Sequence, residues 1–265
     1  MDKLAKISSR DNRRLVRVRS IRDGKEAAEL FVEGRRLVAE ALRSQLDIEE
    51  CFVVERFADR QLLEAVALRT GLIAELPAKI FGTIADTNQP QGIIVVAKRP
   101  SGSQTEIESR LKSARLPLTV FLKEVNNPSN LGAILRTVEA ADAAGVIVST
   151  NSADVFSPKA LRAAMGASFR IPIWQYARFD EVLHWAKIKN LTTTAADISG
   201  SRSYTQVDWN QPRLLIFGSE ARGLDKSELE LLGETIRIPM ENNVESLNLA
   251  VSAGIILFEA KRQSS

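Results

Sequence analysis

From residue 116 to the C-terminus, runs of consecutive apolar residues alternate with segments of helical spacing, and this alternation restricts the possible fold most strongly. The runs at 118–122, 145–149 and 213–217 lack a polar residue at every second position, as expected of strands that are buried on both faces of a sheet. Such strands, separated by helices, predict an α/β fold with a mostly parallel sheet. The predicted strands are 118–122, 145–149, 170–174, 191–195, 213–217 and 235–239, and the predicted helices are 130–143, 158–166, 179–188, 225–232 and 247–262.

The first hundred residues predict a smaller α/β unit. Helical spacing covers residues 26–45, although Gly34 interrupts it, and four consecutive β-branched residues indicate a strand within 92–100. Pro, Gly and Ser cluster from residue 100 onward, where the apolar periodicity stops. We therefore expect an N-terminal domain at 1–99, a linker at 100–115 and a C-terminal domain at 116–265.

Composition excludes several classes of protein. The chain has one cysteine, Cys51, and one histidine, His184, which exclude an internal disulfide framework and any multi-thiolate or multi-histidine metal centre. No apolar run reaches the roughly 20 residues of a membrane span, and the basic N-terminus lacks the apolar region of a secretory signal. We therefore expect a cytoplasmic protein with no metal site and no membrane partner.

The charge of the chain is concentrated at the N-terminus. Residues 1–25 carry nine basic and three acidic side chains, whereas the whole chain has a net charge of only +3. Arginine and lysine contacts to phosphates supply sequence-independent affinity for nucleic acids, so this asymmetry indicates a polyanionic partner. A solvated basic helix face is the alternative interpretation.

Three polar segments follow predicted strands of the C-terminal domain, where open α/β sheets bind their ligands. Each has an ordinary structural explanation when taken alone: an N-cap, a surface charge, or a strand-to-helix turn. The segments are 123–142 with Asn130 and Arg136, 217–230 with Gly218, Glu220 and Gly223, and 237–254 with Ser246 and Asn248.

Other common site patterns are absent from the sequence. No G-x-G-x-x-G follows a predicted strand, and the phosphate-binding G-x-x-x-x-G-K-[ST] pattern is missing. With His184 on a predicted amphipathic helix, the sequence offers no Ser-His-Asp or Cys-His set for nucleophilic catalysis.

Together and in this order, the three segments resemble the signature motifs of the SpoU/TrmH group of SPOUT RNA 2'-O-ribose methyltransferases. The matching stretches are NPSNLGAILRT (127–137), IFGSEARGL (216–224) and IPMENNVESLNLAVSAGIILFE (238–259). The N-terminal domain also resembles the substrate-binding domain of the L30e type that precedes this catalytic domain in many members. The resemblance therefore extends over nearly the whole chain.

The resemblance implies a SPOUT α/β-knot domain with a deep trefoil knot, a homodimer, and S-adenosylmethionine as the methyl donor. Arg136 is then the central catalytic residue, and because guanidinium stays protonated, we expect it to bind the phosphate beside the target ribose. By motif position, the implied cofactor contacts are Thr194, Gly218, Ile238 and Leu247, and the implied catalytic residues are Asn130, Arg136, Glu220, Ser246 and Asn248.

The implied reaction is methylation of a ribose 2'-hydroxyl in RNA. The N-terminal substrate-binding domain favours 23S ribosomal RNA as the target, with transfer RNA as the alternative. A non-catalytic RNA-binding module and an enzyme with a different cofactor are the two competing interpretations of the whole chain. The presence of all five polar motif residues favours an active methyltransferase over a non-catalytic module.

Overall fold

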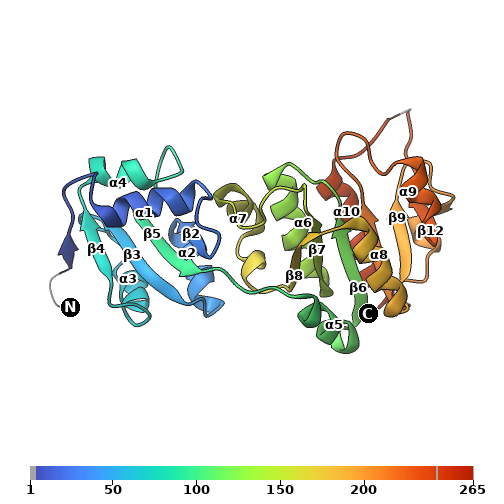
Figure 1. Ribbon diagram of the computed structural model, residues 1–265, viewed down its shortest axis with the longest axis horizontal. Coiled ribbons are helices and arrows are strands. Elements are labelled where there is room, and N and C mark those ends of the chain that lie inside the picture. The colour runs from blue at the N-terminus through green and yellow to red at the C-terminus, as the bar shows by residue number, and fades with distance from the viewer. Residues whose placement is uncertain (1–3, 243, 265) are drawn as a thin grey trace. The chain divides into compact units, whose positions relative to one another are not determined.

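The computed structural model describes residues 4–242 and 244–264. The chain divides into two compact units, one formed by Met1–Ser101 with Phe156–Phe169 and the other by Gly102–Val155 with Arg170–Ser265. Each unit contains its own sheet (Figure 1). The division confirms that both halves of the sequence form α/β structure, as their helix and strand patterns predict.

The first unit is built on a five-stranded mixed sheet in the order β1-β4-β3-β5-β2. Helices α1 and α4 pack together on one face, where Leu15, Val18 and Phe81 join the buried cluster, and α2 and α3 contact each other. The strands are β1 (Ala5–Lys6), β2 (Glu29–Glu33), β3 (Ile48–Val54), β4 (Ile73–Leu76) and β5 (Ile93–Lys98), and the helices are α1 (Arg13–Arg22), α2 (Arg35–Arg43), α3 (Arg60–Ala67), α4 (Ala78–Ile84) and α7 (Pro158–Ala164), with a 3-10 turn at Ala167–Phe169.

The helix predicted over residues 26–45 is wrong in its first half. Residues Glu29–Glu33 form strand β2, which pairs antiparallel with β5, and only the second half is helical. Gly34 separates the two elements with a φ of 100°, which glycine adopts without strain. Pairing with a strand more than sixty residues away therefore overrides the local helical spacing.

The second unit is built on a seven-stranded sheet in the order β10-β12-β9-β11-β6-β7-β8, and every pairing in it is parallel. This confirms the parallel sheet predicted from the buried strand pattern, whereas the trefoil knot stays a prediction of the resemblance. The strands are β6 (Leu116–Leu122), β7 (Ala143–Ser149), β8 (Ile173–Ala177), β9 (Thr192–Ala196), β10 (Arg202–Ser203), β11 (Arg213–Phe217) and β12 (Glu234–Arg237).

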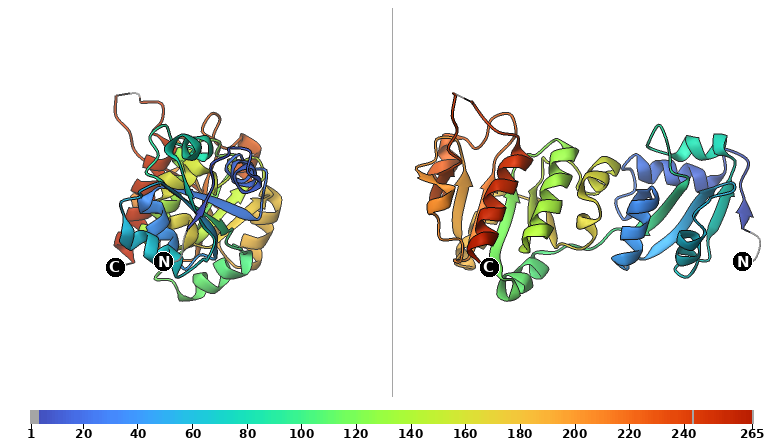
Figure 2. Two further views of the ribbon diagram at one scale, coloured as in Figure 1. Left: turned by 90° about the vertical axis from the view of Figure 1, so that its left-hand side faces the viewer. Right: turned by 180° about the vertical axis from the view of Figure 1, so that it is seen from behind.

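Four helices of this unit begin within two residues of their predicted positions, whereas the helix at Gln104–Ser113 was not predicted. The predicted linker contains helix α5, whose Ile107 is fully buried and which packs on β6 and β7. Helix α10 lies side by side with α6 (Figure 2). The helices are α5 (Gln104–Ser113), α6 (Pro128–Ala141), α8 (Phe179–Ile188), α9 (Lys226–Glu230) and α10 (Leu249–Gln263), with a 3-10 turn at Tyr204–Gln206.

Two further properties of the described residues limit the kinds of site they can form. None of their helices combines the length and hydropathy needed to cross a membrane. Nor do three or more of their His, Cys, Asp or Glu side chains gather in a way that could hold a metal ion. Cys51 is buried in β3 of the first unit, and its thiol is free.

Candidate active site

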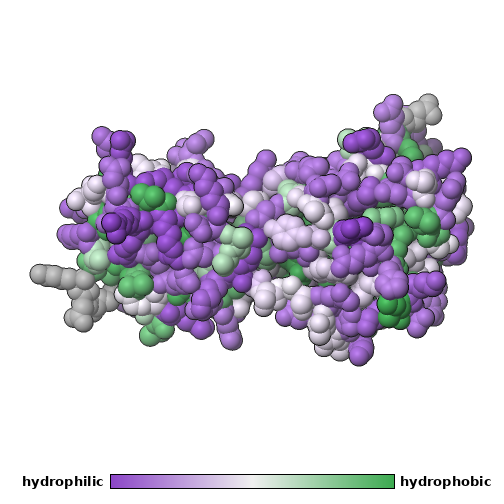
Figure 3. All heavy atoms as spheres, in the orientation of Figure 1, coloured by the Kyte–Doolittle hydropathy of each residue, from purple (hydrophilic) through white to green (hydrophobic). Residues whose placement is uncertain are grey.

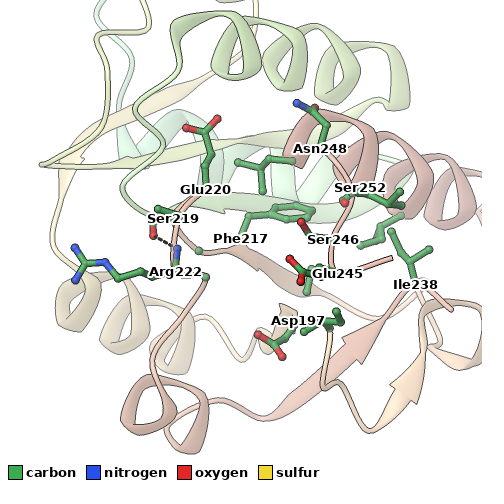
Figure 4. Close-up of a pocket in the computed structure, with 18 of the residues that line it drawn as sticks. Asp197, Phe217, Ser219, Glu220, Arg222, Ile238, Glu245, Ser246, Asn248 and Ser252 are labelled. Carbon is green, nitrogen blue, oxygen red and sulfur yellow. Dashed lines mark hydrogen bonds between the residues drawn. The ribbon is translucent and has the colours of Figure 1, made fainter. Parts of the chain in front are cut away.

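A cavity of about 510 Å³ opens where the carboxyl ends of β9, β11 and β12 meet the first turn of α10. Parallel strands end at the same edge of a sheet, so segments far apart in the sequence converge there. Figure 4 shows Glu220, Ser246 and Asn248 gathered around this cavity. The three motif segments therefore contribute to one site.

The loop after β11 is a tight turn that depends on two glycines. Ser219 and Gly223 exchange backbone hydrogen bonds of 3.1 and 2.8 Å across it, and Gly223 has a φ of 66°. A Cβ on Gly218 would lie 2.2 Å from the carbonyl carbon of Gly223. Gly218 therefore lets the two arms of the turn approach, and the turn presents Glu220 at its tip.

A chain of side-chain hydrogen bonds joins the three motif segments. The Asn130 amide Nδ2 donates to Glu220 Oε1, and Asn248 Nδ2 donates to Asn130 Oδ1 over 3.1 Å. The second carboxylate oxygen of Glu220 accepts from the backbone N–H of Asn127 at the start of α6. These bonds fix Asn130 in one amide orientation at the cavity wall.

Asn248 has a second function at the N-terminus of α10. Its Oδ1 accepts from the backbone N–H groups of Ala250 and Val251 at 2.9 and 3.3 Å, which is N-capping. Asn248 therefore occupies the N-cap position of α10, two residues after Ser246. Ser246, Leu247 and Ile238 line the cavity instead, as does Gly218.

Thr194 does not line the cavity. Thr194 lies within strand β9, and its side chain is fully buried. Its hydroxyl donates a hydrogen bond to Glu234 Oε1 and accepts one from Arg213 Nη1, each at 2.9 Å. Arg213 also forms an ion pair with Glu234. The hydroxyl of Thr194 therefore belongs to a cluster that joins β9, β11 and β12, and the contact of Thr194 with a cofactor stays a prediction.

Arg136 also lies outside the cavity lining. It is exposed on α6, six residues after Asn130, and no hydrogen bond or ion pair joins it to another described residue. The structure therefore brings Asn130, Glu220 and Asn248 into direct contact but leaves Arg136 unattached. The Glu220 carboxylate therefore binds the start of α6 and forms no hydrogen bond or ion pair with Arg136.

Sequence reasoning missed two acidic residues of the lining. Asp197 follows β9, and its Oδ1 accepts from the backbone N–H and hydroxyl of Ser199 at 2.8 and 2.6 Å. Glu245 directly precedes Ser246 and lines the cavity from the other side. The position of Asp197 after a predicted strand was the available signal, because open α/β sheets bind their ligands at the carboxyl ends of their strands.

An all-parallel α/β unit with a cavity of this volume at the carboxyl edge of its sheet is typical of proteins that bind a small-molecule substrate or cofactor. The wall of hydrogen-bonded amide and carboxylate groups supplies the few convergent polar contacts that such sites use. The comparison with known proteins gives the particular family. Residues 117–258 match the SpoU rRNA Methylase family, and the chain belongs to this family of RNA 2'-O-ribose methyltransferases, which use S-adenosylmethionine.

The remainder of the chain also matches a known domain. Residues 4–95 match the MRM3-like substrate binding domain, as the L30e-type resemblance predicted. Together the two matches account for both units of the fold.

Three known proteins illustrate the similarity. A 23S rRNA (uridine(2479)-2'-O)-methyltransferase from Streptomyces viridochromogenes is 32% identical over 77% of this chain and 71% of its own. The crystal structure of an AdoMet-bound rRNA methyltransferase from Sinorhizobium meliloti is 30% identical with a TM-score of 0.82, covering 98% of both chains. A structure described as giving insights into the 2-OH methylation of C/U34 on tRNA is 29% identical with a TM-score of 0.51, and covers 55% of this chain and 89% of its own.

Proposed function

We propose that this protein methylates a ribose 2'-hydroxyl of 23S ribosomal RNA. The observation that carries the catalytic part is the convergence of the three motif segments on one cavity, with Asn130, Glu220 and Asn248 hydrogen-bonded together at its wall. The choice of RNA is supported by the Streptomyces relative, which is named for 23S rRNA. A second support is the N-terminal substrate-binding domain.

Transfer RNA is the alternative substrate, and the extent of the match favours ribosomal RNA over it. The structure connected with tRNA methylation covers 55% of this chain, whereas the Sinorhizobium rRNA methyltransferase covers 98%. The first unit therefore has a counterpart in the rRNA enzyme. We assign residues 1–99 to RNA binding and residues 116–265 to catalysis, with 100–115 between them.

The cavity fits S-adenosylmethionine by size, because its volume of about 510 Å³ lies within the range of cofactor sites. In our assignment Gly218, Ile238 and Leu247 hold the donor, largely through backbone groups. The donor supplies an activated methyl group on a sulfonium, so the protein mainly has to align donor and acceptor.

The residues of the hydrogen-bonded wall position the ribose. Asn130 uses one amide hydrogen and one carbonyl lone pair in the wall, which leaves a second hydrogen and a second lone pair for the substrate. Ser246 offers a hydroxyl from the opposite loop. Glu220 and Asn248 orient Asn130 and are positioning residues in this scheme.

Arg136 binds the phosphate next to the target ribose. Its exposed guanidinium has no partner among the described residues, and its planar fork suits a phosphate. Because the guanidinium stays protonated, Arg136 acts by holding the phosphate and the adjacent 2'-hydroxyl in position rather than as a general base.

We also propose that two copies of the chain pair through α10. The sequence of α10 is apolar on nearly all sides, yet Val251 and Phe258 are 51% and 50% exposed in the single chain. A second copy would cover these side chains and the adjacent α6. Light scattering on the purified protein should give twice the mass of one chain, and Phe258→Glu should lower it to that of a monomer.

The function is tested by mapping 2'-O-methyl groups in ribosomal and transfer RNA from cells with and without the gene. We expect the loss of one modification in 23S rRNA, and loss only in tRNA would contradict the proposed substrate. In a parallel assay, Arg136→Ala should abolish methylation while the affinity for S-adenosylmethionine is retained. Lysine at this position should restore little activity, since it lacks the bidentate geometry.

A further inference from the structure

Much of the basic N-terminal segment is neutralised within the first unit. Arg14 of α1 forms an ion pair with Glu50, and Arg17 pairs with Glu49 at 2.6 Å as well as with Glu29 and Glu50. Glu50 is only 4% exposed, so these pairs lie at the junction of the helix and the sheet. The two arginines join α1 to β2 and β3, and are not available to a polyanion.

Two further arginines of this segment are also engaged. Arg22 contacts Asp23 at 2.9 Å and donates to the backbone carbonyl of Ala85 at 3.1 Å. Arg19 donates to the carbonyl of Arg10 at 2.9 Å. The face over α1 and α4 is mostly hydrophilic (Figure 3), and the charges of Arg14, Arg17 and Arg22 in this segment are paired with acidic residues. An RNA site is therefore better sought among cations without internal partners.

Such cations lie at the carboxyl end of β2. Arg35 and Arg36 begin helix α2, both are exposed, and neither has an ion pair with another described residue. The loop that carries them is held in place, because the Gln91 side chain accepts from the backbone N–H of Arg35 at 2.8 Å. Buried Glu33 accepts from the N–H groups of Asp86 and Thr87, which fixes the neighbouring loop.

A cavity of about 230 Å³ lies between these two loops and α7. Its lining is mixed: Arg36 and Arg162 supply positive charge, buried Glu33 supplies a carboxylate, Thr87 and Gln89 supply hydrogen-bonding groups, and Met165 supplies an apolar surface. The Arg162 charge is balanced by Asp86 at 2.6 Å, and the Glu33 carboxylate is held by the N–H groups of Asp86 and Thr87. The exposed cations without an ion pair to another described residue are Arg36, which lines the cavity, and its neighbour Arg35.

We propose that this cavity is an RNA-docking site, separate from the methylation site, which takes one unpaired nucleotide of the substrate. The arginines at the rim bind the flanking phosphates, and the base enters the cavity, where Gln89 and Thr87 meet its polar edge and Met165 its face. Sequence-specific RNA recognition commonly targets unpaired bases in this way. The inference rests on the proposed function, because it takes RNA as the substrate.

The test is the affinity of the full-length protein for in vitro transcribed 23S rRNA, measured by filter binding at several salt concentrations. Arg35→Ala/Arg36→Ala should lower the affinity and reduce the slope of log K against log salt by about 0.7 to 1 per arginine. Gln89→Leu should weaken binding several-fold and leave the slope unchanged, since it removes no charge. Calorimetry with S-adenosylmethionine should give wild-type affinity for both variants.

The matched control is Lys25→Ala/Arg69→Ala, which removes the same charge from the same unit. Strands β2, β3 and β4 run in one direction. Lys25 precedes β2 and Arg69 precedes β4, whereas Arg36 follows β2, so the two control residues lie at the opposite end of the sheet from Arg36. This variant should bind like the wild type, and an equal loss of affinity in it would overturn the proposal. So would wild-type binding by the Arg35/Arg36 variant.

Different results would contradict the proposed function and the proposed docking site. If the wild-type protein binds S-adenosylmethionine but neither binds nor methylates 23S rRNA, the substrate assignment is wrong. If it methylates 23S rRNA and the Arg35/Arg36 variant does so with unchanged affinity, only the docking site is wrong.

Discussion

Replacement of Gly218 by alanine tests how far catalysis depends on the tight turn after β11. The new Cβ would lie 2.2 Å from the Gly223 carbonyl carbon, 2.4 Å from its oxygen and 2.5 Å from the backbone nitrogen of Leu224. Carbon atoms pack at about 3.5 Å or more, so the two arms must separate by about 1 Å. All three neighbours are backbone atoms, and therefore no side chain can rotate away.

Separation of the arms breaks the backbone bonds between Ser219 and Gly223, which are 3.1 and 2.8 Å long. It also moves Glu220 away from Asn130 and the N–H of Asn127. A misplacement of about 1 Å in a reacting geometry costs on the order of 100-fold in rate. Overpacking of this kind costs about 1–3 kcal/mol of unfolding free energy.

The assay combines single-turnover methylation of RNA, calorimetry with S-adenosylmethionine and thermal unfolding. We expect Gly218→Ala to lose about 100-fold in methylation rate and to bind the donor more weakly. Gly82→Ala is the control: Gly82 lies in α4 with nothing within 4 Å of its Cβ position, so the variant should keep full activity. Wild-type turnover and donor affinity in Gly218→Ala would refute the geometric argument.

Three other predictions concern groups away from the cavity. Thr194→Val should cost about 1–3 kcal/mol of stability, because it removes the hydroxyl that binds Arg213 and Glu234. Calorimetry should find an unchanged affinity for S-adenosylmethionine, and a loss of affinity without a loss of stability would show that the hydroxyl contacts the donor. Hydrogen bonds from Lys189, Trp185 and Gln104 lower the pKa of Glu108 from 4.5 to about 2, so its stabilisation is complete above pH 4.5 and lost as the pH falls toward 2. Glu108→Gln should therefore lower the melting temperature at pH 7, by an amount equivalent to about 1 kcal/mol, and this deficit should shrink below pH 4.5; a deficit independent of pH would contradict the assignment. Burial raises the pKa of Cys51 to about 12, so iodoacetamide at pH 8 should label the thiol only after unfolding, and rapid labelling of the native protein would show that β3 opens readily.

Local sequence predicted the second unit better than the first. Its strands at Leu116–Leu122, Ala143–Ser149 and Arg213–Phe217 are nearly continuous apolar runs, and burial on both faces leaves little choice of structure. In the first unit, residues Glu29–Glu33 have helical spacing but form a strand, because antiparallel pairing with Ile93–Lys98 decides their conformation. The sequence alone does not show which distant segment a strand will meet.

For the candidate site too, the sequence indicated some features and only the structure showed others. The residue types and their order indicated Asn130, Glu220, Ser246 and Asn248, and the structure places all four at the cavity. The orientation of Thr194 could not be read from the sequence, because it depends on Arg213 and Glu234 on neighbouring strands. Whether a side chain faces a cavity or a buried cluster is a property of packing.

The sequence by itself determined the parallel α/β architecture and the polar groups at the carboxyl ends of its strands, because both follow from short-range patterns of polarity. Only the tertiary structure decided which charges remain available to a partner. Arg14 and Arg17 look like part of a basic arm in the sequence, yet Glu49 and Glu50, more than thirty residues away, neutralise them. An ion pair is formed by proximity in space, and folding alone establishes that proximity.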